Sequence, residues 1–215
     1  MSVEVKICGL STPETVDAAV AAGADMIGLV FFPKSPRNVS LEQAAILADR
    51  ARGKTRIVTL VVDADDALLQ EIAARVKPDL IQAHGSESPE RIAEIGRLAG
   101  KPVIKAIRVK DEADIASAAQ FSRVADLILY DAKAPETLGS SLPGGNGHAF
   151  DWGLLEGEKR PAFMLAGGLT PENVAEAIRV TGAPVVDVSS GVETAPGIKD
   201  IGLIRKFIEA AKHPR

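Results

Sequence analysis

At 215 residues, 46% of them hydrophobic and 25% charged, the chain can bury one sizeable core and has the composition of a globular protein. A single cysteine excludes an internal disulfide and a cysteine-rich zinc site, and a formal net charge of -4 gives no electrostatic reason to expect nucleic acid. No apolar run is long enough to cross a bilayer and the N-terminus lacks the features of a secretory signal, so we expect no membrane partner and a cytoplasmic location.

Apolar, β-branched runs of strand length alternate with alanine-rich stretches of helical periodicity along the whole chain. The expected strands lie near residues 3–8, 26–31, 56–62, 80–84, 103–107, 126–131, 162–166 and 185–188. The expected helices lie near residues 13–22, 41–52, 65–76, 89–99, 111–119, 171–181 and 198–211, and a short helical turn follows Asp151. Eight strand–helix units leave about 27 residues for each unit, which suffices for a (β/α)8 TIM barrel.

Several of the expected helices carry a start signal of their own. Thr12, Ser88 and Thr170 each place a hydroxyl before Pro-Glu, which is an N-cap followed by proline at the first helical position. Ser40 is followed three residues later by Gln43, which is the pattern of a capping box. These signals predict where four of the helices begin.

A doubly wound open sheet is the competing architecture for alternating strands and helices. Its usual dinucleotide-binding signature is absent, because Cys8-Gly9-Leu10-Ser11 follows the first strand. No linker divides the chain, and the one long irregular stretch, roughly residues 132–149, has the length of a functional loop. We therefore expect residues 1–215 to form one α/β domain, a single (β/α)8 barrel.

Alternation in the first expected strand separates an apolar row from a polar one. Every second residue from Val3 to Ile7 is apolar, whereas Glu4, Lys6 and Cys8 share the other face. In a barrel covered by helices, this polar row must point inward, towards a site at the open end. Most free cysteines are small buried hydrophobes, so this strand alone leaves both interpretations of Cys8 open.

The first and eighth strands are neighbours in a closed barrel. Asp187 shares a face with Ser189, which must reach the barrel mouth, so Asp187 points inward at the depth of Lys6. A lone buried ammonium or carboxylate is costly. We therefore predict a Lys6–Asp187 salt bridge inside the barrel, with an ammonium that also favours the thiolate of Cys8.

Active sites of such barrels lie at the carboxyl ends of the strands, where this chain has Cys8, Arg37, His84 and Asp131. An arginine fork matches a carboxylate or a phosphate, although a loop arginine is more often simply solvated. An acid that ends an apolar strand can cap a helix or act as a general acid. A histidine before glycine at a strand end is more often structural than catalytic.

Two glycine-containing turns follow the seventh and eighth expected strands. They are Gly167-Gly168 and Ser189-Ser190-Gly191. Loops at these two places form the recurrent phosphate site of such barrels, through backbone amides and a helix N-terminus. A glycine pair alone also fits an ordinary tight turn, but the two turns together favour phosphate binding.

Taken together, these stretches resemble the phosphoribosylanthranilate isomerase family over nearly the whole chain. The motifs that carry the resemblance are Lys6-Ile7-Cys8-Gly9-Leu10, Ser35-Pro36-Arg37, Gly144-Gly145-Asn146-Gly147 leading to Phe150-Asp151-Trp152, Leu165-Ala166-Gly167-Gly168-Leu169 with Pro171-Glu172-Asn173-Val174, and Val186-Asp187-Val188-Ser189-Ser190-Gly191-Val192-Glu193. Any one of them could occur by chance, but five in the order of the family are specific.

The resemblance implies a cofactor-free and metal-free Amadori rearrangement of a small phosphosugar in tryptophan biosynthesis. N-(5-phosphoribosyl)anthranilate becomes 1-(2-carboxyphenylamino)-1-deoxyribulose 5-phosphate. The family's roles fall on Asp131 as general acid at the furanose ring oxygen, on Cys8 as general base at C2 and on Arg37 as holder of the anthranilate carboxylate. The glycine turns hold the phosphate, Gln82 and His84 are candidate substrate contacts, and we expect a monomer or a homodimer.

Elementary chemistry agrees with one acid and one base in these roles. Cys8 can act as a base only as thiolate, so its pKa must fall below about 8.5, whereas Asp131 must keep its proton. The chain departs from the family pattern at Ala83, where a larger aliphatic residue is usual and which should face the helices. It also has Asn146 where threonine is common, and there we expect a hydrogen bond kept in altered form.

Two other functions fit parts of the pattern. Another phosphosugar barrel, such as an indole-glycerol-phosphate enzyme, would need lysine and glutamate acid/base groups that are absent at these strand ends. A non-catalytic phosphosugar-binding barrel would keep the glycine turns but would have no reason to keep Cys8 and Asp131 together.

Overall fold

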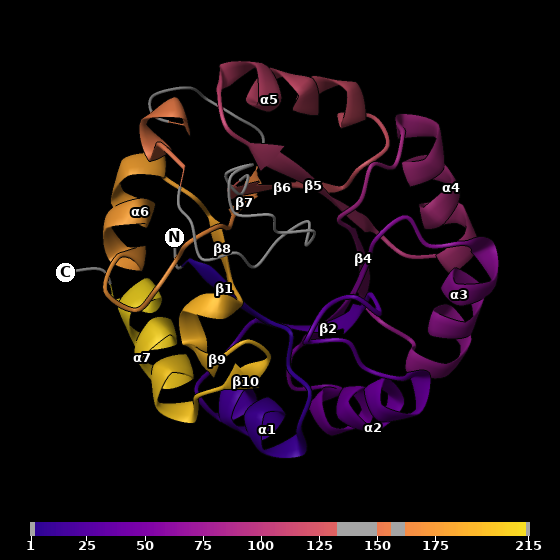
Figure 1. The fold of residues 1–215 in the computed structure, drawn as a ribbon, viewed down its shortest axis with the longest axis horizontal. Coiled ribbons are helices and arrows are strands. Elements are labelled where there is room, and N and C mark those ends of the chain that lie inside the picture. Colours follow the sequence, from indigo (N-terminus) through magenta and orange to yellow (C-terminus); the bar gives the residue numbers. More distant parts are fainter. Residues whose placement is uncertain (1–2, 133–149, 156–161, 214–215) are drawn as a thin grey trace.

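Eight parallel strands close into a barrel in chain order, inside a ring of helices (Figure 1). The computed structural model describes residues 3–132, 150–155 and 162–213. The barrel strands are β1 (Glu4–Cys8), β2 (Met26–Phe31), β3 (Arg56–Val61), β4 (Leu80–Ala83), β5 (Val103–Val109), β6 (Leu127–Ala132), β7 (Phe163–Leu165) and β8 (Val185–Val188). The predicted (β/α)8 architecture is confirmed.

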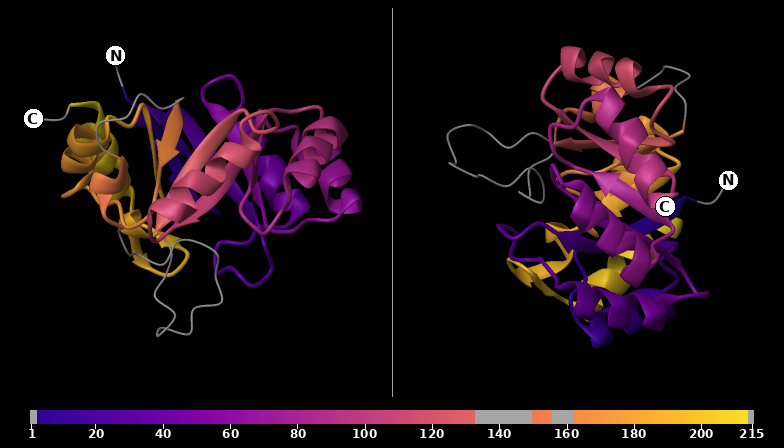
Figure 2. Two further views of the ribbon diagram at one scale, coloured as in Figure 1. Left: turned by 90° about the horizontal axis from the view of Figure 1, so that it is seen from above. Right: turned by 90° about the vertical axis from the view of Figure 1, so that its right-hand side faces the viewer.

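The helices stand outside the strands in every view (Figure 2). They are α1 (Pro13–Ala21), α2 (Leu41–Ala51), α3 (Asp66–Glu71), α4 (Pro89–Ala99), α5 (Glu112–Ser117), α6 (Val174–Thr181) and α7 (Ile201–Lys212). Shorter helical segments are η1 (Ile72–Val76), η2 (Ala118–Phe121), η4 (Trp152–Leu155) and η5 (Ser190–Val192). The turn expected after Asp151 is therefore present as η4, and the expected helices 65–76 and 111–119 each continue in a second helical form.

Three of the four predicted helix starts are confirmed by their hydrogen bonds. The hydroxyls of Thr12, Ser40 and Ser88 each accept a hydrogen bond from the backbone N–H three residues later. The Thr170 start is wrong, because the Thr170 hydroxyl accepts from Glu172 in a local turn and α6 begins only at Val174. A hydroxyl that bonds two residues ahead closes a turn instead of capping a helix.

The expected helix 198–211 begins later than predicted, at Ile201. A two-stranded antiparallel hairpin, β9 (Glu193–Ala195) and β10 (Ile198–Lys199), precedes it. Gly197, with a φ of 83°, makes the turn between the two strands. This hairpin lies beside the barrel mouth in Figure 1, and it bears on the site below.

Alternation along the strands separates two apolar layers. Inward side chains fill the barrel, and outward ones pack against the helices. The inward layer consists of Met26, Val58, Ile104, Ala106, Leu129, Met164, Ala166 and Val185. Ala83 belongs to the outer layer, on the side of the helices as predicted. Within the described residues, no helix is both long enough and apolar enough to span a membrane.

Aspartates hold alternate pairs of strands together at the amino-terminal end of the barrel. Asp25, Asp79 and Asp126 each precede an even-numbered strand and accept a hydrogen bond from the first or second backbone N–H of the strand before it, at 2.7 to 2.8 Å. These hydrogen bonds hold neighbouring strands together at this end, and the longer loops lie at the opposite end of the barrel. That carboxyl end is where the site forms.

Candidate active site

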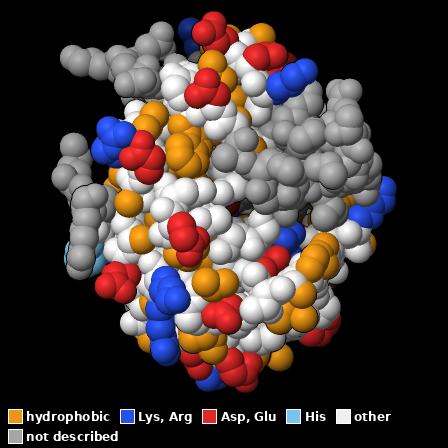
Figure 3. Space-filling model, turned by 60° about the vertical axis from the view of Figure 1, so that its left-hand side comes forward, with side chains coloured by type: hydrophobic (Ala, Val, Ile, Leu, Met, Phe, Trp, Pro, Cys, Tyr) orange, Lys and Arg blue, Asp and Glu red, His pale blue; other side chains and the backbone are white. Residues whose placement is uncertain are grey.

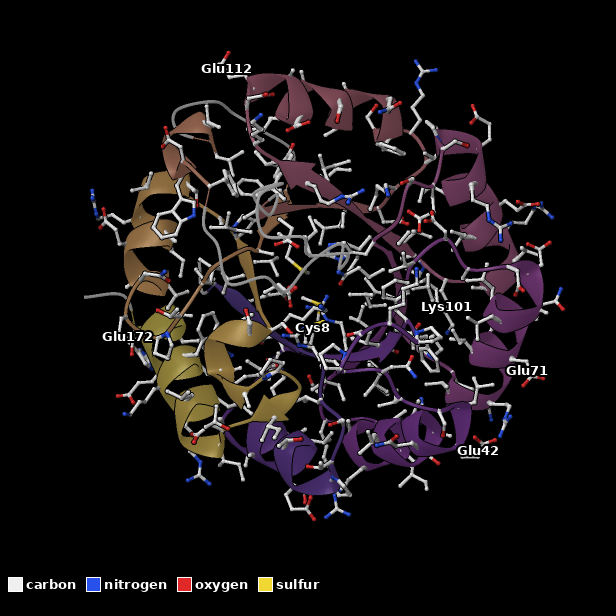
Figure 4. All side chains as sticks on the ribbon, in the orientation of Figure 1. Cys8, Glu42, Glu71, Lys101, Glu112 and Glu172 are labelled. Atoms are coloured by element: carbon white, nitrogen blue, oxygen red, sulfur yellow. The ribbon has the colours of Figure 1, made fainter. Side chains whose placement is uncertain are left out.

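One pocket at the carboxyl ends of the strands brings together most of the residues that the sequence predicted. Its lining includes Cys8, Arg37, His84, Asp131, Gly167, Gly168, Ser189, Ser190 and Gly191. Figure 4 shows Cys8 near the centre of the barrel, whereas the labelled Glu42, Glu71, Glu112 and Glu172 lie at the periphery, on the helical ring. Gln82 lies one inward step below the pocket and contacts His84 instead of lining the cavity.

The position of Cys8 depends on a glycine of the neighbouring strand. Cys8 pairs with Gly28 in the β1–β2 register, and its side chain is buried. A Cβ added at Gly28 would lie 2.8 Å from Cys8 Sγ, so the thiol occupies the space that a side chain would fill. On the other side, Ser189 Oγ donates to the Cys8 carbonyl at 3.1 Å.

The predicted Lys6–Asp187 salt bridge is present. Lys6 Nζ lies 2.9 Å from Asp187 Oδ1, and the two residues stand opposite each other in the β1–β8 register. The Lys6 side chain is completely buried, which alone would lower its pKa, but Asp187 and Cys8 outweigh burial and raise the pKa of Lys6 above its ordinary value. The ammonium is therefore retained inside the barrel.

The pKa of Cys8 depends on its burial and on the charged groups around it. Burial raises the pKa of the Cys8 thiol above its ordinary value, and the charge of Asp187 adds to the rise. Lys6 and also Lys199 act in the opposite direction, as expected of cations, but they do not outweigh burial. Enclosure of the thiol is thus the largest influence on the pKa of Cys8, and the sequence alone did not show how complete that enclosure is.

Asp131 is the end of a buried hydrogen-bonded chain. Its Oδ2 lies 3.2 Å from His84 Nε2, and His84 Nδ1 lies 3.1 Å from Gln82 Nε2. Because the Gln82 amide nitrogen can only donate, Nδ1 must accept, which places the ring proton on Nε2 and directs it to Asp131. The structure thus joins Gln82 and His84 to the carboxyl group of Asp131.

Arg37 is buried, so the interpretation as a solvated loop arginine is wrong. Its Nε and Nη2 donate to the two carboxylate oxygens of Glu193 at 2.7 and 2.8 Å. Gly9 makes room for this arrangement, since a Cβ there would lie 2.6 Å from Arg37 Cδ. Nothing in the sequence indicated that residues 37 and 193 pair, because the contact joins the loop after β2 to the hairpin strand β9.

The two glycine turns lie against each other and against β6. Gly167 and Gly168 have φ values of 86° and 63°, and a Cβ at Gly167 would lie 2.3 Å from the Ala132 backbone nitrogen. A Cβ at Gly191 would lie 1.9 Å from the Leu169 carbonyl oxygen. Only glycine fits at these places, so backbone amides can approach a ligand closely there.

Sequence reasoning missed three residues that shape this pocket, namely Gly28, Glu193 and Lys199. Gly28 pairs with Cys8 in the β1–β2 register, which alternation alone does not determine. Lys199 lay within a predicted helix, which hid its place in a hairpin. The motif Gly144-Gly145-Asn146-Gly147 lies outside the described residues. Among those described, no group of three or more His, Cys, Asp or Glu side chains is arranged to hold a metal ion.

The face of the molecule shown in Figure 3 carries acidic and basic side chains in mixed order, without a large area of one sign. The pocket itself is lined by buried charged side chains, among them Arg37, Asp131 and Asp187. An arginine, two glycine turns, a thiol and a carboxyl group suit a small ligand with anionic groups and a transferable proton.

Comparison with known proteins gives consistent matches over the whole chain. The family model for N-(5'phosphoribosyl)anthranilate (PRA) isomerase matches residues 5–210. N-(5'-phosphoribosyl)anthranilate isomerase of Rhodopseudomonas palustris strain BisA53 is 56% identical over 213 residues, 99% of this chain and 97% of that protein. The protein of the same name from Paramagnetospirillum magneticum is 53% identical over 216 residues, 100% of both chains.

Solved structures agree with these matches. The crystal structure of phosphoribosyl anthranilate isomerase from Thermotoga maritima superposes with a TM-score of 0.87 at 37% identity, covering 98% of both chains. A phosphoribosyl anthranilate isomerase in complex with reduced 1-(o-carboxyphenylamino)-1-deoxyribulose 5-phosphate has a TM-score of 0.84 at 34% identity, again covering 98% of both chains.

Proposed function

The chain belongs to the N-(5'-phosphoribosyl)anthranilate isomerase family, and from this membership we propose that it catalyses the family's Amadori rearrangement with Cys8 as general base and Asp131 as general acid. The enzyme is an isomerase of tryptophan biosynthesis. Its substrate is N-(5-phosphoribosyl)anthranilate, and its product is 1-(2-carboxyphenylamino)-1-deoxyribulose 5-phosphate.

One observation carries the assignment of roles. Cys8 and Asp131 line the same pocket from β1 and β6, and a buried arginine and the two glycine turns line it as well. A sugar held at both ends, by its phosphate and by the carboxylate of its substituent, would lie between a thiol and a carboxyl group. Such a pair meets the need of an aldose-to-ketose shift for one acid and one base.

The acid step opens the sugar ring. Asp131 gives its proton to the furanose ring oxygen, the bond between C1 and that oxygen breaks, and the nitrogen lone pair forms the C1–N double bond of a protonated Schiff base. His84 Nε2–H bonds Asp131 Oδ2, so we place the transferred proton on Oδ1. The Gln82–His84 contact keeps the imidazole in this tautomer.

The base step moves a proton from C2. Cys8 takes this proton, the C2–H electron pair forms the C1–C2 double bond, and the iminium nitrogen becomes neutral. The resulting enolamine tautomerises to the ketone when C1 gains a proton and the C2 hydroxyl loses one, so that the C2–O double bond replaces the C1–C2 double bond. Burial favours the neutral thiol in the resting site, and the positive charge of the Schiff base would favour the thiolate at the moment it is needed.

The test is direct turnover. Mixing the protein with N-(5-phosphoribosyl)anthranilate should abolish the anthranilate-type fluorescence of the substrate. Cys8→Ala and Asp131→Asn should each lower kcat by about 10²–10⁴-fold without unfolding the protein. Asp79→Asn, which changes a carboxylate at the opposite end of the barrel, serves as control. Near-normal kcat in either active-site variant would remove that residue from its role, and binding without turnover would indicate a non-catalytic barrel.

A catalytic thiol must stay reduced, which supports the expected cytoplasmic location. For the assembly we propose a monomer or a homodimer, since a related structure from Thermotoga maritima is described as monomers made from a dimeric enzyme. Sedimentation at two protein concentrations distinguishes the two states.

A further inference from the structure

The hairpin β9–β10 carries two buried charged side chains that the proposed mechanism does not use. The side chains of Glu193 and Lys199 are only 4% and 1% exposed. Lys199 Nζ lies 2.6 Å from Glu193 Oε1. Buried charges are rare unless they are paired, and here the pair lies beside the pocket instead of in the distant core.

Glu193 fixes the orientation of Arg37. The two parallel hydrogen bonds from Nε and Nη2 hold the guanidinium in the plane of the carboxylate. Gly197 N also donates to Glu193 Oε2 at 3.2 Å, so the hairpin turn supports the same carboxylate. A Cβ at Gly197 would lie 2.6 Å from the Pro36 carbonyl oxygen, which shows how closely the hairpin packs on the loop that carries Arg37.

Lys199 connects this arrangement to the opposite end of the pocket. Its ammonium donates to the backbone carbonyl of Ser189 at 2.9 Å and to Ser189 Oγ at 3.2 Å. Ser189 begins the turn to which we assign the phosphate, and its hydroxyl bonds the Cys8 carbonyl. A continuous series of contacts thus runs from Arg37 through Glu193 and Lys199 to Ser189.

The charges in this series suit an anionic ligand at both ends. Arg37 and Lys199 supply two cations against the one carboxylate of Glu193. Burial acts to raise the pKa of Glu193, but Arg37 and Lys199 outweigh it and hold that pKa below the ordinary value. Burial also lowers the pKa of Lys199, and Glu193 opposes that change. The Glu193 carboxylate is therefore ionised and pairs with both cations.

We propose that Glu193 and Lys199 are positioning residues that fix the separation between the guanidinium of Arg37 and the turn at Ser189–Gly191. The inference rests on the proposed function, which puts a carboxylate at one end and a phosphate at the other. A ligand bound at both ends gains from a fixed separation, whereas a ligand bound at one end does not. The pair thus selects phosphosugars whose carboxylate lies at one particular distance from the phosphate.

The test compares a two-ended ligand with its halves. Ribose 5-phosphate probes the phosphate end, anthranilate probes the carboxylate end, and reduced 1-(o-carboxyphenylamino)-1-deoxyribulose 5-phosphate probes both. In Lys199→Met we expect ribose 5-phosphate to bind within about 3-fold of the parent protein and the two-ended ligand to bind about 10- to 100-fold more weakly. KM should rise with it, while kcat changes less.

Glu193→Gln provides a second variant that keeps the shape of the side chain. It should weaken the two-ended ligand and anthranilate but leave ribose 5-phosphate nearly unchanged. Lys212→Met is the matched control. Lys212 lies on α7, away from the pocket, and the substitution removes its ion pair with Asp25. It should alter none of the three affinities.

The outcomes separate this inference from the proposed function. Equal weakening of all three ligands in Lys199→Met and Glu193→Gln would indicate a purely structural pair and overturn the positioning role. Unchanged binding of the two-ended ligand would overturn it as well. If the parent protein neither converts N-(5-phosphoribosyl)anthranilate nor binds the two-ended ligand, the proposed function itself fails.

Discussion

Replacing Lys6 by Met tests whether the charges inside the barrel are interdependent. Two opposite unit charges 2.9 Å apart attract by about 6 kcal/mol at an effective dielectric constant of about 20. Lys6→Met removes this attraction and leaves the Asp187 carboxylate buried, so the free energy of unfolding should fall by about 3–5 kcal/mol. For a chain of this length, that corresponds to a melting temperature lower by roughly 6–20 °C.

Urea unfolding measures the effect in the parent protein, in Lys6→Met and in two further variants. In Lys6→Met/Asp187→Leu both charges are gone, and the loss of unfolding free energy should be smaller than in Lys6→Met alone. Arg56→Met is the matched control, since it breaks an exposed ion pair with Glu4, which lies on β1 as Lys6 does. It should lower the free energy of unfolding by about 0–1 kcal/mol. If Lys6→Met costs no more than Arg56→Met, the two internal charges are not coupled and the reasoning fails.

Three further predictions concern single positions. Gly28→Ala should displace the Cys8 thiol and lower kcat with little change in KM, and steady-state kinetics checks it. Arg37→Ala should raise KM about 10- to 150-fold with little change in kcat, because a charge-assisted contact of roughly 1.5–3 kcal/mol is lost equally from ground and transition states; a fall in kcat alone would place Arg37 in the transition state. Lys105 and Glu87 form a buried pair at 2.7 Å that holds the pKa of Glu87 below 4.5 despite burial. The stability that this depressed pKa provides is present above pH 4.5 and is lost as the pH falls through the lowered value. Lowering the pH from about 7 to about 3 should therefore reduce the melting temperature of the parent protein more than that of Glu87→Gln, as thermal unfolding measures.

Much of the barrel follows from the sequence because its interactions repeat at short range. Strand alternation, helix periodicity and hydroxyl caps are local, and they predicted all eight strands and the starts of three helices. The Lys6–Asp187 pair could be predicted because closure of the barrel fixes which strands are neighbours and alternation fixes depth. The two residues are 181 positions apart in the sequence, but barrel closure makes them neighbours that a simple strand rule can pair.

Contacts made by the segments outside the barrel strands follow no such rule. Arg37 is buried by a hairpin whose residues 198–199 fit a helical pattern equally well, so neither the burial nor the pairing with Glu193 could be read from periodicity. The local hydrogen bond of Thr170 similarly competed with helix capping in a way that a sequence motif does not show. The pKa of Cys8 depends on how fully the thiol is enclosed, which only the packed structure determines.

The surroundings of Cys8 and Asp131 differ in a way that agrees with the opposite roles proposed for them. Cys8 lies on the side of β1 and β8, where Lys6 and Lys199 both favour the thiolate. Asp131 lies across the pocket on β6, where its hydrogen bond comes from the imidazole of His84, a neutral donor in the tautomer described above. A cation favours a nearby anion more strongly than a neutral donor does. In the proposed mechanism, the two cations lie near the group that must become an anion, and the hydrogen bond to the proposed acid comes from a neutral donor.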